Sequence, residues 1–137
     1  MGPYIFNDLG SIDLLADGKH AAVIPASDKG YGVQCVGLVK YYSRAGGTSM
    51  WKQGGSVMGN PTLARGTAIA TFNAKGHYAS AATGNHACFF LRFVAGGFEV
   101  LEQHVNPNPN MIQKRIILTK GGKGSASNDA DAYSVIN

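Results

Sequence analysis

Apolar positions along the chain are spaced first as in helices and then as in strands. A short helix is expected over residues 7–15, ahead of the turn "ADGK". After the loop "PASDKGYG", Val36, Val39 and Tyr42 recur at helical spacing, and the run stops at the glycines of "RAGG". The second helix is therefore predicted to begin at Cys35.

An alternation of apolar and polar residues typical of strands begins at Thr67. Gly96 and Gly97 interrupt this region and predict a tight turn, which makes a hairpin of the strands on either side. The glycine-rich segment before Thr67 is predicted to be irregular. The expected strands, in chain order, are TAIATF, HACFFLRFV, FEVLEQHV, MIQKRIILT and AYSVI. Helices followed by an antiparallel sheet predict the α+β class.

The composition fits one globular domain over residues 1–137. Hydrophobic residues make up 45% of the chain and charged residues only 15%, which argues against disorder. A net charge of +4 favours encounter with an anionic polymer, but the lysines and arginines are scattered and form no dense basic run. This balance suits a negatively charged cell-wall polymer as well as it suits DNA or RNA.

The first residues, "MGPYIFNDLGSIDLL", show neither the basic start nor the long apolar core of a secretory signal. No stretch of the sequence approaches the length of a membrane span. Synthesis in the cytoplasm is therefore expected. Any work outside the cell would need a route other than the general secretion pathway.

Cys35 has three possible roles: a buried hydrophobe, half of a disulfide, or a nucleophile. A cysteine in the first turn of a helix lies near unpaired backbone N–H groups and a partial positive charge, which lower the pKa of its thiol. The same N–H groups can hold the oxyanion that forms when a carbonyl is attacked, and Gln34 places another polar group beside them. Cys35 is thus placed for catalysis.

A cysteine nucleophile also needs a base and a group that orients the base. His86 stands at the head of a predicted strand, and Glu102 lies in the partner strand of the same hairpin, where it can hold the imidazole. His104 shares a strand face with Glu102 by period-two alternation, so it is a second candidate near the site.

Other chemistries find less support in the sequence. Cys88 is expected either to pack inertly or to form an oxidation-sensitive pair with Cys35. The four histidines lack the spacing of a zinc site and the two cysteines form no Cys-x-x-Cys unit, so no metal or other cofactor is expected. The segment "SNDADAY" is predicted to form a turn before the last strand rather than a calcium loop.

Four segments together resemble a bacterial family of cysteine amidases delivered by type VI secretion, the second amidase-effector family. They occur in the family's order and span about residues 27–137: GYGVQCVGLVKYY, LARGTAIATF, GNHACFFLRF and SNDADAYSVI. The placement of Cys35 and His86 is also similar to that in the papain-like CHAP and NlpC-type peptidases. CHAP domains carry Glu-x-Asn after the histidine, whereas this chain has Glu102, Gln103 and His104.

The resemblance implies a papain-like domain whose nucleophile-bearing helix packs on the antiparallel sheet. It implies hydrolysis of an amide bond in peptidoglycan stems or cross-links, with the bond between meso-diaminopimelate and D-alanine favoured. Cys35 would attack, His86 would transfer the proton, and Glu102 would orient His86. Candidates for oxyanion or substrate binding are Gln34, Asn85, His104 and Trp51.

Partners and location also follow from the resemblance. The expected partners are peptidoglycan, the type VI secretion apparatus and an immunity protein that covers the cleft; neither nucleic acid nor membrane insertion is expected. Action is expected in the periplasm of a recipient bacterium, and bond choice is expected to depend on loops 48–60 and 73–84. Two alternatives remain, namely an endogenous wall-remodelling hydrolase and a wall-binding or interaction module without catalysis.

Overall fold

The computed structural model describes residues 3–81 and 83–137, so Ala82 of the predicted loop 73–84 and the first two residues of the chain lie outside the described residues. An antiparallel sheet with strand order β1-β6-β2-β3-β4-β5 forms the centre of the fold. Its strands are β1 (Gln53–Ser56), β2 (Ala68–Thr71), β3 (Ala87–Val94), β4 (Gly97–Gln103), β5 (Ile112–Leu118) and β6 (Tyr133–Ile136). The predicted α+β class is confirmed.

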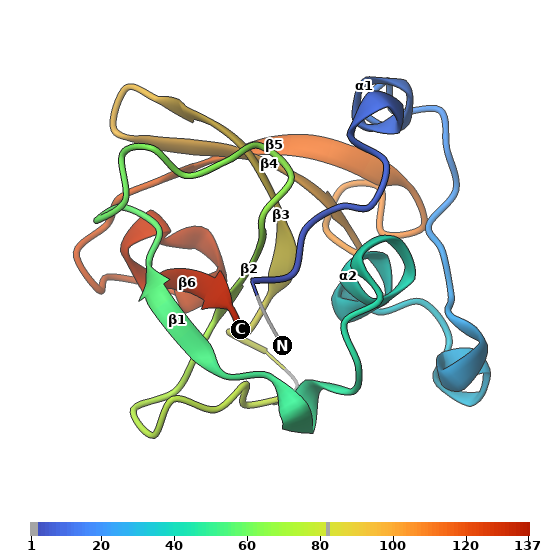
Figure 1. Cartoon of the computed structure of the whole chain (residues 1–137), viewed down its shortest axis with the longest axis horizontal. Helices are drawn as coiled ribbons and strands as arrows, with labels where there is room; N and C mark the ends of the chain where they lie inside the picture. Colours follow the sequence, from blue (N-terminus) through green and yellow to red (C-terminus); the bar gives the residue numbers. More distant parts are fainter. Residues whose placement is uncertain (1–2, 82) are drawn as a thin grey trace.

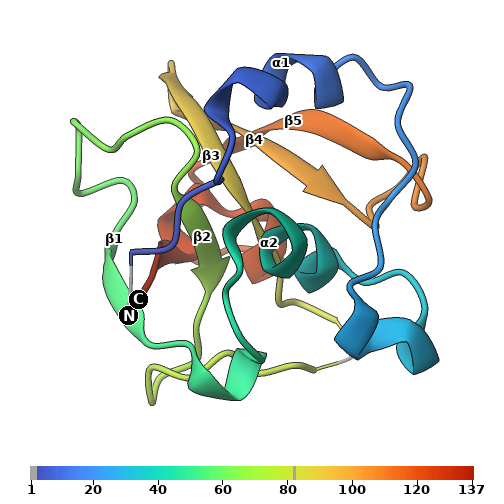
Figure 2. The same cartoon turned by 45° about the vertical axis from the view of Figure 1, so that its right-hand side comes forward.

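The two predicted helices are present. The first comprises a 3-10 turn, η1 (Leu9–Ser11), and one α-helical turn, α1 (Ile12–Leu15). The second, α2 (Cys35–Ser43), begins at Cys35 and lies across one face of the sheet (Figures 1 and 2). It ends at Arg44, which takes the left-handed conformation with φ 59°, two residues before the glycines expected to stop it.

The remaining helical segments are short 3-10 turns between the main elements. They are η2 (Ala26–Tyr31), η3 (Thr48–Met50), η4 (Ala126–Asn128) and η5 (Ala130–Ala132). Within residues 3–81 and 83–137, no helix has the length and apolar character needed to cross a membrane.

Alternation along the strands gives the sheet two hydrophobic faces. On one face, Val36, Leu38 and Val39 of α2 pack with side chains such as Phe89 and Leu101. On the other face, a second cluster includes Phe90, Val100, Ile117 and Tyr133. It is covered by the segment that carries η4 and η5, because Ala130 and the start of β6 belong to the same cluster. Cover on both faces explains why β2 is buried at all four of its positions.

The five predicted strands are confirmed, with three differences in detail. β1 was expected to be irregular, because its sequence QGGS has no apolar alternation; it pairs with β6 at the edge of the sheet, largely exposed. The β3–β4 turn lies one residue earlier than expected, because Gly97 already pairs with Val94. His104 was expected inside a strand but follows β4, exposed, with φ 63°.

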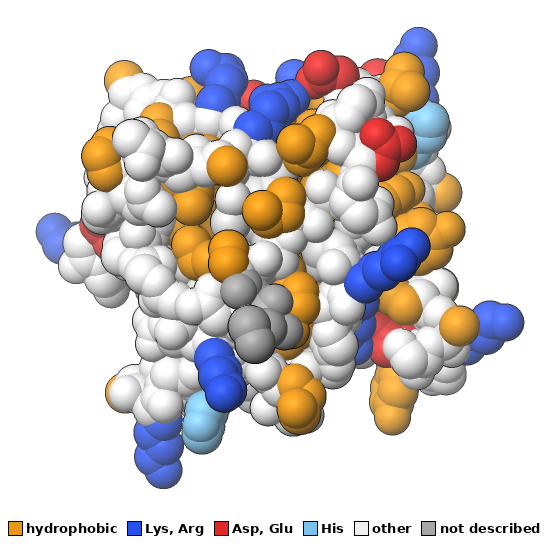
Figure 3. Space-filling view, in the orientation of Figure 1, with side chains coloured by type: hydrophobic (Ala, Val, Ile, Leu, Met, Phe, Trp, Pro, Cys, Tyr) orange, Lys and Arg blue, Asp and Glu red, His pale blue; other side chains and the backbone are white. Residues whose placement is uncertain are grey.

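The surface is charged without a single basic patch on the face shown in Figure 3. Some Lys and Arg side chains gather at the top of that face beside acidic ones, others lie singly around it, and hydrophobic side chains are interspersed among polar ones. Segments near the two ends of the chain lie side by side, because the Tyr4 amide donates to the Ile136 carbonyl at 3.2 Å.

Gln103, at the end of β4, ties the start of α2 to the sheet. Its side chain is fully buried and accepts a hydrogen bond from the Val23 amide at 2.8 Å. Its Nε2 donates to the carbonyls of Val23 at 2.9 Å and Gln34 at 2.7 Å. Gly37 permits this approach, because a Cβ there would lie 3.0 Å from both Gln103 Nε2 and the Val23 carbonyl oxygen. Gln103 thereby fixes the residue that precedes Cys35.

We expect Gln103→Leu to lower the free energy of unfolding by about 1–3 kcal/mol, because it leaves backbone groups of Val23 and Gln34 without partners. Urea unfolding followed by circular dichroism measures this change. Gln113→Leu, on the half-exposed side of β5, is the matched control and should unfold close to the parent. Equal unfolding midpoints for both variants would show that the Gln103 contacts do not hold this region.

Candidate active site

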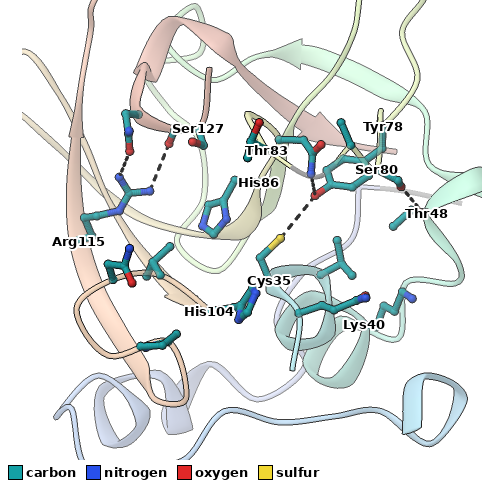
Figure 4. A pocket seen from close by; sticks show the side chains of 18 residues that line it. Cys35, Lys40, Thr48, Tyr78, Ser80, Thr83, His86, His104, Arg115 and Ser127 are labelled. Atoms are coloured by element: carbon teal, nitrogen blue, oxygen red, sulfur yellow. Dashed lines mark hydrogen bonds between the residues drawn. The ribbon is translucent and has the colours of Figure 1, made fainter. Parts of the chain in front are cut away.

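A cleft of about 870 Å³ opens at the N-terminal end of α2. Its walls come from the start of α2, the loop before β3, the connection from β4 to β5, and η4 (Figure 4). Polar side chains dominate the lining, and no Asp or Glu is among the described residues that form it. The lining residues central to the chemistry are Gln34, Cys35, Tyr78, Asn85, His86 and Arg115.

Cys35 lies in the first turn of α2, half-buried, with its sulfur toward the cleft (Figure 4). Gln34 precedes it in extended conformation and supplies no side-chain cap to the helix. The Gly37 amide donates to the Gln34 carbonyl at 3.1 Å, whereas the amides of Cys35 and Val36 precede the first intrahelical hydrogen bond. These groups and the partial positive charge of the helix end favour an anion beside Cys35.

His86 faces Cys35 from the sheet and is held on two sides. Its backbone amide donates to Thr71 Oγ1 at 3.0 Å, and its carbonyl accepts from the Thr71 amide at 3.0 Å. On the ring, Nε2 lies 2.8 Å from Glu102 Oε1. Because Phe89 pairs with Leu101, Glu102 falls opposite Cys88 and reaches His86 diagonally rather than directly. The other ring nitrogen, Nδ1, is then left to face the thiol.

Glu102 is completely buried and would be costly there without partners. Arg115 on β5 supplies them: its Nε donates to Oε2 at 2.7 Å and its Nη2 donates to Oε1 at 3.1 Å. The guanidinium also donates to Asn128 Oδ1 at 2.8 Å and to the Ser127 carbonyl at 3.2 Å. The carboxylate that orients His86 is thus itself fixed by a bidentate ion pair.

The electrostatics favour a thiolate and an imidazolium. Burial alone would raise the pKa of Cys35, but His86 and the Tyr78 hydroxyl favour the charged form and bring the pKa below the ordinary thiol value. Burial would lower the pKa of His86, but interactions with Cys35 and Glu102 raise it to about 9. Burial likewise opposes ionisation of Glu102, yet His86 and Arg115 hold its pKa below the usual range.

Three comparisons with known proteins bear on this site. A family model described as "Domesticated amidase effector 2" matches residues 17–136. The type VI secretion amidase effector 2 protein of Salmonella typhi is 37% identical over 112 residues, covering 75% of this chain and 84% of that protein. A solved structure of type 6 secretion amidase effector 2 matches with a TM-score of 0.77 and 32% identity, covering 99% of this chain and 95% of that one.

The chain belongs to the type VI secretion amidase effector 2 family. The family match covers most of the sequence, and the structural match covers nearly all of it. The predicted family and the predicted papain-like fold are therefore both confirmed.

Most of the residues expected at this amidase-family site meet at the cleft. Cys35, His86, Gln34, Asn85 and His104 line it, and Glu102 lies directly behind His86. Trp51 differs from expectation: it is 2% exposed and is not among the described residues that line the cleft. Its ring packs edge-on against Tyr78 at 5.2 Å, so it supports the cleft wall from behind.

Cys88 takes no part in a disulfide; both cysteines are free. It is fully buried in the second hydrophobic cluster, and burial together with the Glu102 charge raises the pKa of its thiol well above the ordinary value. The inert role among the two expected for Cys88 agrees with this placement.

The acidic segment before β6 forms a turn, as expected. Asp129 accepts hydrogen bonds from the amides of Lys120, Gly122 and Asp131. Within residues 3–81 and 83–137, no group of His, Cys, Asp and Glu side chains is arranged to hold a metal ion.

Sequence reasoning missed Tyr78 and Arg115. Arg115 could have been found from pattern, since it shares a strand face with Ile117 and belongs to a strand that neighbours Glu102. Tyr78 lies in a loop without periodicity, and no pattern in the surrounding sequence predicts the 3.5 Å distance between its hydroxyl and Cys35 Sγ.

Alkylation of Cys35 by iodoacetamide should follow the thiolate and so persist below the ordinary thiol pKa. We expect His86→Ala to raise the midpoint pH of alkylation by about one to three units, because it removes the cation that lowers the Cys35 pKa. Glu102→Gln should raise the midpoint less, because the imidazole remains but is less strongly protonated. Cys88→Ala is the control and should leave the midpoint unchanged. If His86→Ala had the same midpoint as the parent, there would be no thiolate–imidazolium pair between Cys35 and His86.

Proposed function

We propose that this protein is a type VI secretion effector that hydrolyses an amide bond of peptidoglycan by a Cys35-His86-Glu102 mechanism. The observation that carries the proposal is the contact of 2.8 Å between His86 Nε2 and a carboxylate oxygen of buried Glu102. This pair lies beside a cysteine at the start of a helix, and the chain belongs to the amidase effector 2 family. The bond between meso-diaminopimelate and D-alanine is the favoured target.

The proposed reaction begins with the Cys35 thiolate and the protonated His86. The sulfur attacks the scissile carbonyl carbon, a C–S bond forms, and the electron pair of the C=O bond moves to oxygen. The backbone N–H of Cys35, with Gln34, stabilises this oxyanion. His86 then gives its proton to the leaving amine as the C–N bond breaks, and an acyl-enzyme remains.

Hydrolysis of the acyl-enzyme reverses the role of the imidazole. Neutral His86 takes a proton from water, which attacks the thioester carbon, and the C–S bond breaks to restore the thiolate. Glu102 keeps the ring oriented through both half-reactions and stabilises the imidazolium when it forms. Arg115 prevents Glu102 from taking up that proton, because it favours the carboxylate form.

The lining of the cleft suits a polar peptide such as a peptidoglycan stem, because hydroxyl, amide and imidazole side chains form most of it. Lys40 and Arg115 are part of the wall, but each already has an acidic partner, Asp28 for Lys40 and Glu102 for Arg115. Both loops expected to govern bond choice reach the cleft: Thr48 and Ser80 line it, and their hydroxyl oxygens lie 3.3 Å apart. We assign bond choice to these two loops.

Digestion of purified Gram-negative sacculi tests the proposal. The parent protein should convert cross-linked dimers to tetrapeptide monomers, identified by chromatography and mass spectrometry, whereas Cys35→Ala should be inactive with its fold retained by circular dichroism. Cleaved stems with intact cross-links would support amidase activity but show that the enzyme cuts a different bond, within the stem peptide. Substantial activity of Cys35→Ala would contradict the assignment of Cys35 as the nucleophile. If the parent protein left the muropeptide profile unchanged under reducing conditions, a binding module would be favoured.

We further propose action in the periplasm of a recipient bacterium and a cognate immunity protein that covers the cleft. The purified product of an adjacent gene should stop sacculus digestion at a stoichiometric amount. It should bind Cys35→Ala as well as the parent, because covering the walls does not require the sulfur. Undiminished digestion in the presence of that product would exclude it as the immunity protein and favour an endogenous wall-remodelling hydrolase.

A further inference from the structure

Tyr78 contacts the nucleophile from the side opposite His86. Its hydroxyl oxygen lies 3.5 Å from Cys35 Sγ, and the two side chains point toward one another across the cleft (Figure 4). The phenol is 8% exposed, so little water competes for it. It comes from the loop between β2 and β3, whereas His86 comes from the start of β3, so the sulfur has a polar partner on each side.

Asn85 determines what the Tyr78 hydroxyl can do. Asn85 Nδ2 donates to Tyr78 Oη at 3.2 Å. With its oxygen already accepting, the hydroxyl has its own proton left to donate, and the sulfur of Cys35 is the acceptor within reach. The arrangement therefore aims one O–H donor at the thiolate.

The phenol is also held in place and kept protonated. Trp51 packs against its ring at 5.2 Å, and the Trp51 indole is itself fixed by donating to the Gly46 carbonyl at 2.9 Å. Burial and the nearby Cys35 charge raise the pKa of Tyr78 above its ordinary value. The hydroxyl therefore stays protonated, and able to donate, at pH values at which an ordinary tyrosine begins to ionise.

We propose that Tyr78 is a further catalytic residue, which donates a hydrogen bond to the Cys35 thiolate and then to the oxyanion, whose oxygen is bonded to the carbon that the sulfur attacks. No proton leaves the phenol: the thiolate forms the C–S bond, the carbonyl oxygen takes the electron pair, and the O–H donor follows the negative charge from sulfur to oxygen. The proposal rests on the cysteine mechanism proposed above.

Asn85 is a positioning residue in this scheme, because it acts through Tyr78. Its Oδ1 is buried and has no hydrogen-bond partner among the described residues, although it belongs to a side chain that lines the cleft. A buried acceptor of this kind is satisfied when a donor arrives. A substrate N–H bound in the cleft supplies such a donor, so Asn85 also links substrate binding to the orientation of Tyr78.

Tyr78→Phe tests the proposal while keeping the ring that packs on Trp51. The midpoint pH of Cys35 alkylation by iodoacetamide should rise by about one unit, because the thiolate loses a hydrogen bond. With sacculi as substrate, kcat should fall about 100-fold with KM little changed, as for loss of an oxyanion donor. Tyr31→Phe, on the exposed η2 turn, is the matched control and should behave as the parent.

Asn85→Ala and the double variant Tyr78→Phe/Asn85→Ala complete a double-mutant cycle. Asn85→Ala alone should raise the alkylation midpoint, but it should add little when Tyr78 is already Phe, because its effect passes through the hydroxyl. If the shifts in alkylation midpoint of the two single variants simply added in the double variant, Asn85 would not act through Tyr78. An alkylation profile of Tyr78→Phe equal to that of the parent, or an unchanged kcat, would overturn the proposal. Alkylation needs no wall substrate, so this result is separate from failure of the proposed function.

Discussion

The end of β4 aligns the two halves of the active site. Glu102 and Gln103 are neighbours in the strand, so their side chains project to opposite faces of the sheet. Glu102 holds the His86 ring, and Gln103 holds the carbonyl of Gln34, the residue before Cys35. His86 and Cys35, the proposed base and nucleophile, come from distant parts of the chain, but two neighbouring residues of β4 set their relative position. A shift of β4 by one residue would exchange the two faces and lose both contacts.

This alignment depends on placing a carboxylate where water cannot reach it. A buried carboxylate without partners would take up a proton and lose its hold on an imidazolium. The bidentate Arg115 pair prevents that, and Asn128 and the Ser127 carbonyl hold the far side of the guanidinium. η4, which carries these two residues, therefore belongs to the site although it is remote from Cys35 in sequence. Burial, together with the same Glu102 charge, raises the pKa of the Cys88 thiol well above its ordinary value and so favours its neutral form.

The sequence predicted the elements whose pattern repeats and missed those that depend on single contacts. α2 and the strands from β2 to β6 follow from helical spacing and from alternation, and Cys35 and His86 were found because each stands at the start of such an element. β1 was not predicted, because its sequence QGGS has no alternation of apolar and polar residues. It is recognised as a strand by its backbone pairing with β6. Trp51 was expected among the candidates for substrate binding, but its side chain packs behind Tyr78. Tyr78 could not be found from the sequence, because a loop gives no period from which to infer direction.

The loop between β2 and β3 combines two demands that usually conflict. A group that touches the nucleophile must be rigid, whereas a wall that selects substrates must vary. The first half of the loop is fixed: Asn73 Oδ1 accepts from the amides of Lys75 and His77, and Tyr78 packs on Trp51. The stretch that follows is exposed at Ser80 and Thr83, which line the cleft. Because rigidity and exposure fall on successive parts of one segment, side chains at the cleft wall can change without displacing the hydroxyl beside Cys35.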